Sequence, residues 1–292
     1  MAGAGATQPE RVGVGSTAAR AENAGPANSA AQPELVGADR SKNCGAAPLA
    51  NVICITNRKL CPLNPPSGSA FPAPKEPDAP GYVLVPEDSS ATEYVPAPKE
   101  PKRQEALLAM EMDALLRRLP QIIAKHPQAI ILREKDLSEK DYEMLLRRCQ
   151  PLCDAAGIPL IAHTFAGAAR RLGVARLHLP LPLLLKNGGR PQGFDLVGTS
   201  VHSIDDAKKA LACGADYLIA GHIFETGCKA GLPGRGLPFL KKICQISTVP
   251  VYAIGGITVD KLPKIQEAGA AGGCMMSGLF TGRYSSQVPC KL

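Results

Sequence analysis

Aromatic side chains are scarce in this chain of 292 residues: tryptophan is absent, and Phe and Tyr make up only 4% of the sequence. Single-stranded nucleic acids are usually held by stacking their bases on aromatic rings. The sequence also lacks the runs of Lys and Arg that are typical of nucleic-acid-binding segments. We therefore expect no nucleic-acid partner.

Long apolar segments are missing as well. No stretch reaches the length of about 18 apolar residues that a membrane-spanning helix needs, and the N-terminus does not have the pattern of a secretory signal. Ten cysteines are present, but none has the Cys-X-X-Cys spacing of many metal and redox sites. These absences predict a cytoplasmic protein with reduced thiols and no membrane partner.

Proline and glycine, by contrast, are abundant, with 27 and 29 residues, and they are unevenly distributed. Residues 1–49 are rich in Ala, Gly and small polar residues, which predicts a disordered extension. Residues 61–101 form a Pro-rich insertion in which Pro-Ala-Pro-Lys-Glu-Pro occurs twice, and Tyr82–Val85 between the copies could pair as a short strand. The folded domain is therefore expected over 50–292, interrupted by this insertion.

The positive charge of the chain is concentrated in the predicted domain. The total is +7, residues 1–49 contain four basic and four acidic side chains, and residues 61–102 contain three and six, which leaves +10 on the remainder. A positive domain suits an anionic substrate, although solvated surface lysines would give the same excess.

Short apolar segments alternate with amphipathic segments along this domain. A parallel sheet with helical crossovers has this pattern, and eight units in about 240 residues indicate a closed (β/α)8 TIM barrel of the α/β class. The expected strands are 50–56, 129–132, 158–162, 175–179, 194–198, 216–220, 249–254 and 272–276. The expected helices are 103–125, 138–156, 165–173, 203–213, 237–246 and 258–268, followed by a short terminal helix.

Histidines are placed near the carboxyl ends of the expected strands, where TIM barrels bind their substrates. His163, His178, His202 and His222 are four of the five histidines in the chain. Each alone could be a structural residue, but together they indicate a site at this rim. No carboxylate accompanies them at ligand spacing, so we expect no metal site.

Glycine turns and cations predict anion binding at the same rim. Exposed amides and a helix dipole after the seventh and eighth strands could hold a phosphate, although glycines also occur in such turns for conformational reasons alone. Three cations could hold carboxylate or phosphate groups, or else lie in water at the rim. The residues are Gly255, Gly256, Ser277 and Gly278 in the turns, and the cations Arg133, Lys135 and Lys229.

The segment 221–229 combines several reactive groups. His222 offers an acid-base group, because an imidazole ordinarily titrates near pH 6.5, and Thr226 and Lys229 offer anion contacts. Cys228 lies next to Lys229, but no partner base at a fixed spacing identifies it as a nucleophile. Cys149 and Cys153, four residues apart on one helix face, are best explained as buried packing residues.

Several of these motifs occur together in one known family. They are Ile-Leu-Arg-Glu-Lys at 131–135, Ser-Val-His-Ser at 200–203, Gly-His-Ile-Phe-Glu-Thr at 221–226, Gly-Leu-Pro-Gly-Arg-Gly at 231–236 and Ala-Ile-Gly-Gly-Ile-Thr at 253–258. With these motifs in this order, residues 50–280, apart from the insertion, resemble the thiamine-phosphate synthase and TenI superfamily. The resemblance implies a barrel that binds a thiazole phosphate at the glycine loops after strands seven and eight, and we expect His163 and His202 among the residues that bind the substrate.

The two branches of this superfamily imply different reactions. The synthase joins thiazole phosphate to hydroxymethylpyrimidine diphosphate and holds Mg²⁺ on acids that follow strands three and four. Here these places read His163-Thr164 and 179–184, which contain no acid. Gly221-His222 replaces the usual Gly-Pro of the synthase and resembles the thiazole tautomerase branch, in which the histidine is the acid-base catalyst. Gly227 differs from the Asp that tautomerases often have in this loop.

Three functions therefore follow from the sequence. The leading hypothesis is a tautomerase that aromatises a thiazole carboxylate phosphate through His222 and needs no cofactor. The alternatives are an atypical synthase that uses Mg²⁺, and a non-catalytic regulator that binds thiazole phosphate and contacts a partner through its Pro-rich insertion. The sequence leaves the oligomeric state open, a homo-oligomer included, and assigns no role to residues 1–49, His178 or Cys228.

Overall fold

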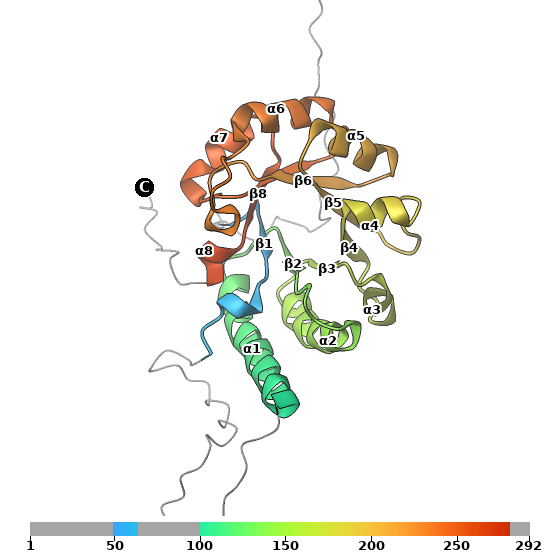
Figure 1. Ribbon diagram of the computed structural model, residues 1–292, viewed down its shortest axis with the longest axis vertical. Coiled ribbons are helices and arrows are strands. Elements are labelled where there is room, and N and C mark those ends of the chain that lie inside the picture. The colour runs from blue at the N-terminus through green and yellow to red at the C-terminus, as the bar shows by residue number, and fades with distance from the viewer. Residues whose placement is uncertain (1–48, 64–99, 281–292) are drawn as a thin grey trace, which may run out of the picture. The chain divides into compact units, whose positions relative to one another are not determined.

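A computed structural model describes residues 49–63 and 100–280 (Figure 1). Of the predicted extension only Leu49 is described, and it is buried in the core. Most of the predicted Pro-rich insertion, including Tyr82–Val85, lies outside the described residues. No helix in the described part of the chain is long and apolar enough to span a membrane.

Eight parallel strands close into a barrel in the order β1 to β8, with β8 paired to β1. The predicted (β/α)8 TIM barrel is therefore confirmed, with small shifts at several strand ends. The largest shift is at β5, which occupies 196–201 instead of 194–198. The strands are β1 Val52–Ile55, β2 Ala129–Leu132, β3 Leu160–His163, β4 Arg176–Pro180, β5 Leu196–Val201, β6 Tyr217–Gly221, β7 Val251–Ile254 and β8 Gly272–Met275.

Both faces of these strands are buried. Ile53, Ile131 and Ile161 pack in the barrel interior together with Tyr217 and Tyr252. The residues between them, such as Ile130 and Leu132, pack outward in the layer beneath the helices. Burial on both faces explains why the strands read as continuous apolar runs in the sequence.

The helices form a ring around the strands (Figure 1). Ser138 caps α2 by accepting a hydrogen bond from the backbone N–H of Asp141, as its sequence position predicts. The helices are α1 Glu100–Ile123, α2 Glu139–Ala155, α3 Ala166–Arg171, α4 Leu181–Lys186, α5 Ile204–Ala212, α6 Gly236–Ile246, α7 Leu262–Glu267 and α8 Ser277–Phe280.

Two helices differ from the sequence-based expectation. α4 was not predicted, because prolines punctuate its sequence; the structure accommodates Pro182 in the first turn, where a proline removes no helical hydrogen bond. The predicted helix over 258–268 is wrong at its start, since Val259–Lys261 form a 3-10 turn and α7 begins only at Leu262.

Cys149 and Cys153 are buried on the inner face of α2, which confirms them as packing residues. Burial raises the pKa of the Cys153 thiol to about 12. A thiol with such a pKa stays protonated and is a poor nucleophile.

Candidate active site

The segment that follows β6 is docked on the glycine turn that follows β7. The backbone N–H of Ile223 donates to the Ile254 carbonyl over 2.8 Å, and that of Phe224 donates to the Gly255 carbonyl over 3.0 Å. A Cβ atom on Gly255 would lie 2.3 Å from the Cβ of His222. Gly255 is therefore required for close packing against His222, which is a structural reason for a glycine that the sequence assigned to phosphate binding.

Gly256 is required for the same approach. Its φ of +63° lies in the left-handed region, and a Cβ atom there would lie 2.4 Å from the carbonyl oxygen of Glu225. The helical segment after the glycines begins as the 3-10 turn Val259–Lys261, with Thr258 as its N-cap, and continues into α7 at Leu262. A phosphate would meet loop amides here.

His222 lies at the carboxyl end of β6 and is partly exposed. Its Nε2 atom lies 3.4 Å from the carbonyl oxygen of Leu232, in the segment between β6 and α6. A hydrogen bond of that length is weak. The imidazole can therefore exchange this contact for a ligand at small cost.

His202 follows β5 and contacts the same segment. Its Nδ1 lies 2.9 Å from the carbonyl oxygen of Gly221, and its backbone N–H donates to Asp206. A carbonyl can only accept, so Nδ1 carries the proton. His202 thus fixes the peptide that precedes His222.

Arg133, Lys135 and His163 lie together at the ends of β2 and β3. His163 is buried, and burial lowers its pKa to about 3, with further lowering by the charges of Arg133 and Lys135. His163 is therefore neutral near pH 7 and can offer a substrate only a neutral hydrogen bond. Its Nδ1 lies 2.7 Å from the hydroxyl of Thr164. The backbone φ of Thr164 is +69°, which is unusual for a β-branched residue.

His178 does not lie at the rim, which corrects the sequence-based expectation. It lies within β4 and is only 2% exposed, with Nδ1 3.0 Å from the Tyr217 hydroxyl and Nε2 2.9 Å from the Ser200 hydroxyl. Its ring stacks on that of His163, with centroids 5.7 Å apart. His178 belongs to a polar layer inside the barrel, beneath the site.

Two cavities border the predicted site residues. One, of about 630 Å³, is lined by the segment 225–233, which contains Thr226 and Lys229. The other, of about 360 Å³, is lined by Arg133, Lys135 and their neighbours at the ends of β1 and β2. Ser277 and Gly278 are the first two residues of α8, directly after β8. His222 is not among the residues that line either cavity, but its ring contacts the carbonyl of Leu232, which lines the larger one.

Residues 106–279 match the protein-family model described as thiamine monophosphate synthase. The chain belongs to this family.

Two relatives of the chain carry the name thiamine-phosphate synthase. The chain is 32% identical over 184 residues to thiamine-phosphate synthase of Coprothermobacter proteolyticus, covering 62% of the chain and 81% of the relative. It is 32% identical over 160 residues to the synthase of Thermus thermophilus, covering 54% and 78%. Thiamine phosphate pyrophosphorylase from Pyrococcus furiosus superposes with a TM-score of 0.53 at 18% identity, over 81% of this chain and 90% of that one, which supports the fold.

The described residues do not fit the Mg²⁺ site that the synthase resemblance implies. Among residues 49–63 and 100–280, no group of three or more His, Cys, Asp or Glu side chains is arranged to hold a metal ion. His163 ends β3 and Thr164 follows it, and neither is an acid. Two acids at the end of β2, Glu134 and Asp136, are instead bonded to Arg58 and Lys59.

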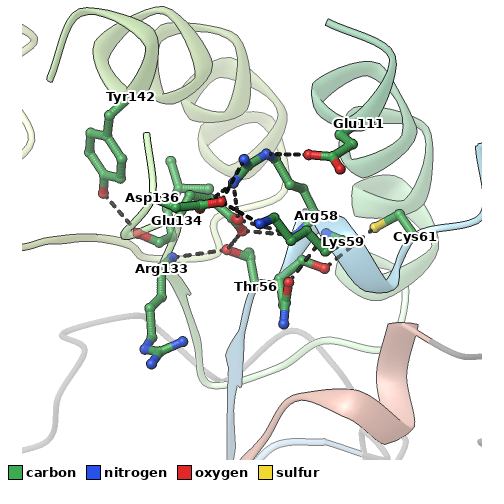
Figure 2. Close-up of polar contacts among 11 residues, drawn as sticks. Thr56, Arg58, Lys59, Cys61, Glu111, Arg133, Glu134, Asp136 and Tyr142 are labelled. Atoms are coloured by element: carbon green, nitrogen blue, oxygen red, sulfur yellow. Dashed lines mark hydrogen bonds and ion pairs between the residues drawn. The ribbon is translucent and has the colours of Figure 1, made fainter. Parts of the chain in front are cut away.

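Arg58, Glu134 and Asp136 were not predicted as site residues from the sequence. Their side chains meet behind the rim, where the ends of β1 and β2 approach α1 (Figure 2). Glu134 was visible in the family motif at 131–135, and Arg58 as a basic residue directly after a strand. Nothing local in the sequence indicates that the two residues pair.

Proposed function

We propose that this protein acts on a thiazole phosphate in thiamine biosynthesis, and that its reaction is the tautomerisation of a thiazole carboxylate phosphate by His222. The observation that carries the proposal is the position of His222, at the end of β6 and packed against the Gly255 turn. The lack of acids after β3 and β4 also favours a proton transfer over a transfer of diphosphate.

The proposed reaction needs one base that becomes an acid. The substrate carries an exocyclic double bond, and the His222 imidazole removes a proton from a ring carbon. The electron pair moves through the conjugated system, and the imidazolium returns a proton to the exocyclic carbon, which leaves an aromatic ring. Proton loss and gain balance, and no redox partner is needed.

The remaining site residues would bind the anionic ends of this substrate. The turn at Gly255 and Gly256, together with Ser277 and Gly278, offers backbone amides to the phosphate. Arg133, Lys135 and Lys229 offer positive charge to the phosphate and the carboxylate. His163 and His202 would line the site, His163 as a neutral hydrogen-bonding group. His222 must first leave the Leu232 carbonyl.

Replacing His222 by alanine tests this role. We expect His222→Ala to reduce tautomerisation by at least about 100-fold, the usual loss when a general acid-base group is removed, with ligand binding near normal. NMR can follow conversion of the exocyclic tautomer. The control is His126→Asn, which changes an exposed histidine before β2 and should keep full turnover. Normal turnover of His222→Ala would exclude the proposed role.

A thiamine-phosphate synthase is the second candidate, because the relatives described above carry that name. In this case Arg133 and Lys135 would hold the diphosphate of the pyrimidine substrate. Incubation of the purified protein with thiazole phosphate, hydroxymethylpyrimidine diphosphate and Mg²⁺ separates the two candidates. Formation of thiamine phosphate at an enzymatic rate would replace the tautomerase proposal by the synthase.

A further inference from the structure

Residues of β2 alternate between two sides of the barrel wall. Ala129 and Ile131 face the barrel interior, whereas Ile130 and Leu132 face the helices. After the strand ends at Leu132, Arg133 and Lys135 lie close enough to His163 to lower its pKa, whereas the buried Glu134 pairs with Arg58. Figure 2 agrees, since the Arg133 side chain points away from Glu134.

Next to these cations lies the Arg58 cluster, which we define as Arg58, Glu111, Glu134 and Asp136; Glu134 and Asp136 line the same cavity as Arg133 and Lys135. The Arg58 and Glu134 side chains are only 4% and 2% exposed and lie 3.2 Å apart, Nη1 to Oε2. Arg58 also binds both carboxylate oxygens of Asp136, over 2.7 and 3.0 Å, and its Nε lies 3.0 Å from Glu111 of α1. Three carboxylates thus surround one guanidinium, so Arg58 is not available to an anionic substrate.

Glu134 connects this cluster to the rim itself. It accepts a hydrogen bond from the Thr56 hydroxyl over 2.7 Å, and its two carboxylate oxygens share the backbone N–H of Arg58, each at 3.2 Å. The oxygen of the Thr56 hydroxyl in turn accepts from the backbone N–H of Arg133 over 2.9 Å. The cluster therefore holds the backbone from which Arg133 projects, and it ties the end of β2 to the end of β1.

We propose that Arg58 and Glu134 are positioning residues that hold Arg133 and Lys135 at the mouth as a preformed anion-binding pair. This inference rests on the proposed function, in which these two cations bind the anionic substrate. Cations on a fixed backbone bind an anion with less loss of conformational freedom than cations on a loose loop. Loss of the buried ion pair should therefore weaken anion binding without removing any group that touches the anion.

Binding of inorganic pyrophosphate to the full-length protein tests the proposal without any need for turnover. Isothermal titration calorimetry is done on the wild type, Arg58→Lys, Arg133→Met and the double variant. We expect Arg58→Lys to weaken pyrophosphate binding about tenfold, and to have a smaller effect in the Arg133→Met background, where only Lys135 of the pair remains to be positioned, since residues that act through one network are not additive. In the tautomerase assay the change should appear in KM more than in kcat.

The matched control is a second ion pair on the opposite side of the barrel, before β5 and β6. Arg190 Nε lies 3.0 Å from Asp216 Oδ2 there. Asp216→Asn should lower thermal stability and leave pyrophosphate affinity unchanged. Equal loss of affinity in Asp216→Asn, full additivity of Arg58→Lys with Arg133→Met, or no pyrophosphate binding by the wild type would each overturn the proposal.

A milder variant keeps the test open if Arg58→Lys does not fold. Glu111→Gln alters the α1 side of the cluster, where the Glu111 side chain is 17% exposed and is not among the residues that line the cavity of Arg133 and Lys135, and it should weaken pyrophosphate binding in the same direction by less. Unchanged affinity in a folded Glu111→Gln would count against the proposal. The pyrophosphate titrations and the turnover of His222→Ala test different claims. Normal turnover of His222→Ala would exclude the tautomerase mechanism, but it would not change the measured effect of Arg58→Lys on pyrophosphate binding.

Discussion

The imidazole rings of His163 and His178 are kept uncharged near pH 7 by their surroundings. Both are buried, stacked on one another and hydrogen-bonded through at least one ring nitrogen, to Thr164 for His163 and to Tyr217 and Ser200 for His178. Burial lowers the pKa of both, and Arg133 lowers both further. Because both rings stay neutral, His163 and His178 add no positive charge beneath Arg133 and Lys135.

The pKa of His163 makes a prediction for stability against pH. The pKa of His163 is near 6.5 in an unfolded chain and about 3 in the folded protein. At a pH between these values the imidazole is protonated in the unfolded chain and neutral in the folded protein. The free energy of unfolding should thus fall as the pH is lowered from 6.5 to 4.5, by up to about 1.4 kcal/mol per pH unit for each such group.

Urea unfolding of the wild type and of His163→Gln measures this effect. Glutamine binds no proton, so the variant should have a smaller pH dependence over the same range, while the exposed control His126→Asn should keep the dependence of the wild type. Equal slopes for His163→Gln and the wild type would show that His163 is not held neutral by the fold.

At the scale of elements, the loop after β6 and the turn after β7 form one unit. Backbone hydrogen bonds from Ile223 and Phe224 join them, and the Lys261 ammonium adds a tie by donating to the Gly256 carbonyl over 2.7 Å while lying 4.7 Å from the centroid of the Phe224 ring. The position of His222 therefore depends on a turn more than 30 residues further along the chain.

Gly256→Ala tests that dependence. The new Cβ atom would lie 2.4 Å from the Glu225 carbonyl oxygen, so the loop that carries His222 must move. We expect a lower kcat and a loss of about 1–3 kcal/mol in the free energy of unfolding. Gly157→Ala is the matched control, because Gly157 has nearly the same φ, +64°, but nothing within 4 Å of an added Cβ. If both variants lose the same activity, close packing of the two loops does not position His222.

At the scale of the whole molecule, the barrel is closed where β8 meets β1. Gly272 begins β8, and an added Cβ atom would lie 2.2 Å from the carbonyl oxygen of Asn51, which also accepts a hydrogen bond from Gly273. A closed barrel has no free sheet edge. A clash at this seam therefore disturbs strands from both ends of the domain.

Gly272→Ala should accordingly lower the stability of the entire barrel. We expect a shift of about 1–3 kcal/mol toward unfolding, seen equally by circular dichroism and by tyrosine fluorescence in a urea titration. The control Gly227→Ala adds a Cβ with nothing within 4 Å and should leave the midpoint unchanged. A shift in only one of the two probes would mean that the seam opens independently of the remaining barrel.

The sequence by itself determined the barrel, the family and the position of His222 at the end of a strand. These features depend on local patterns: short apolar runs, capping residues such as Ser138, and motifs whose residues are close together in the chain. The predicted ends of some strands differ from the observed ends by a few residues. The helix α4 was not predicted, because prolines usually break a helix, although a helix can begin with a proline in its first turn.

Only the tertiary structure decided which residues meet across the fold. Arg58 and Glu134 are 76 residues apart, separated by the proline-rich segment, and neither has a local signal for the other. His178 could not be assigned to the barrel interior until β4 was placed against Tyr217 of β6. Such contacts are set by strand register and by closure of the barrel, which bring distant positions together through packing that no short stretch of sequence encodes.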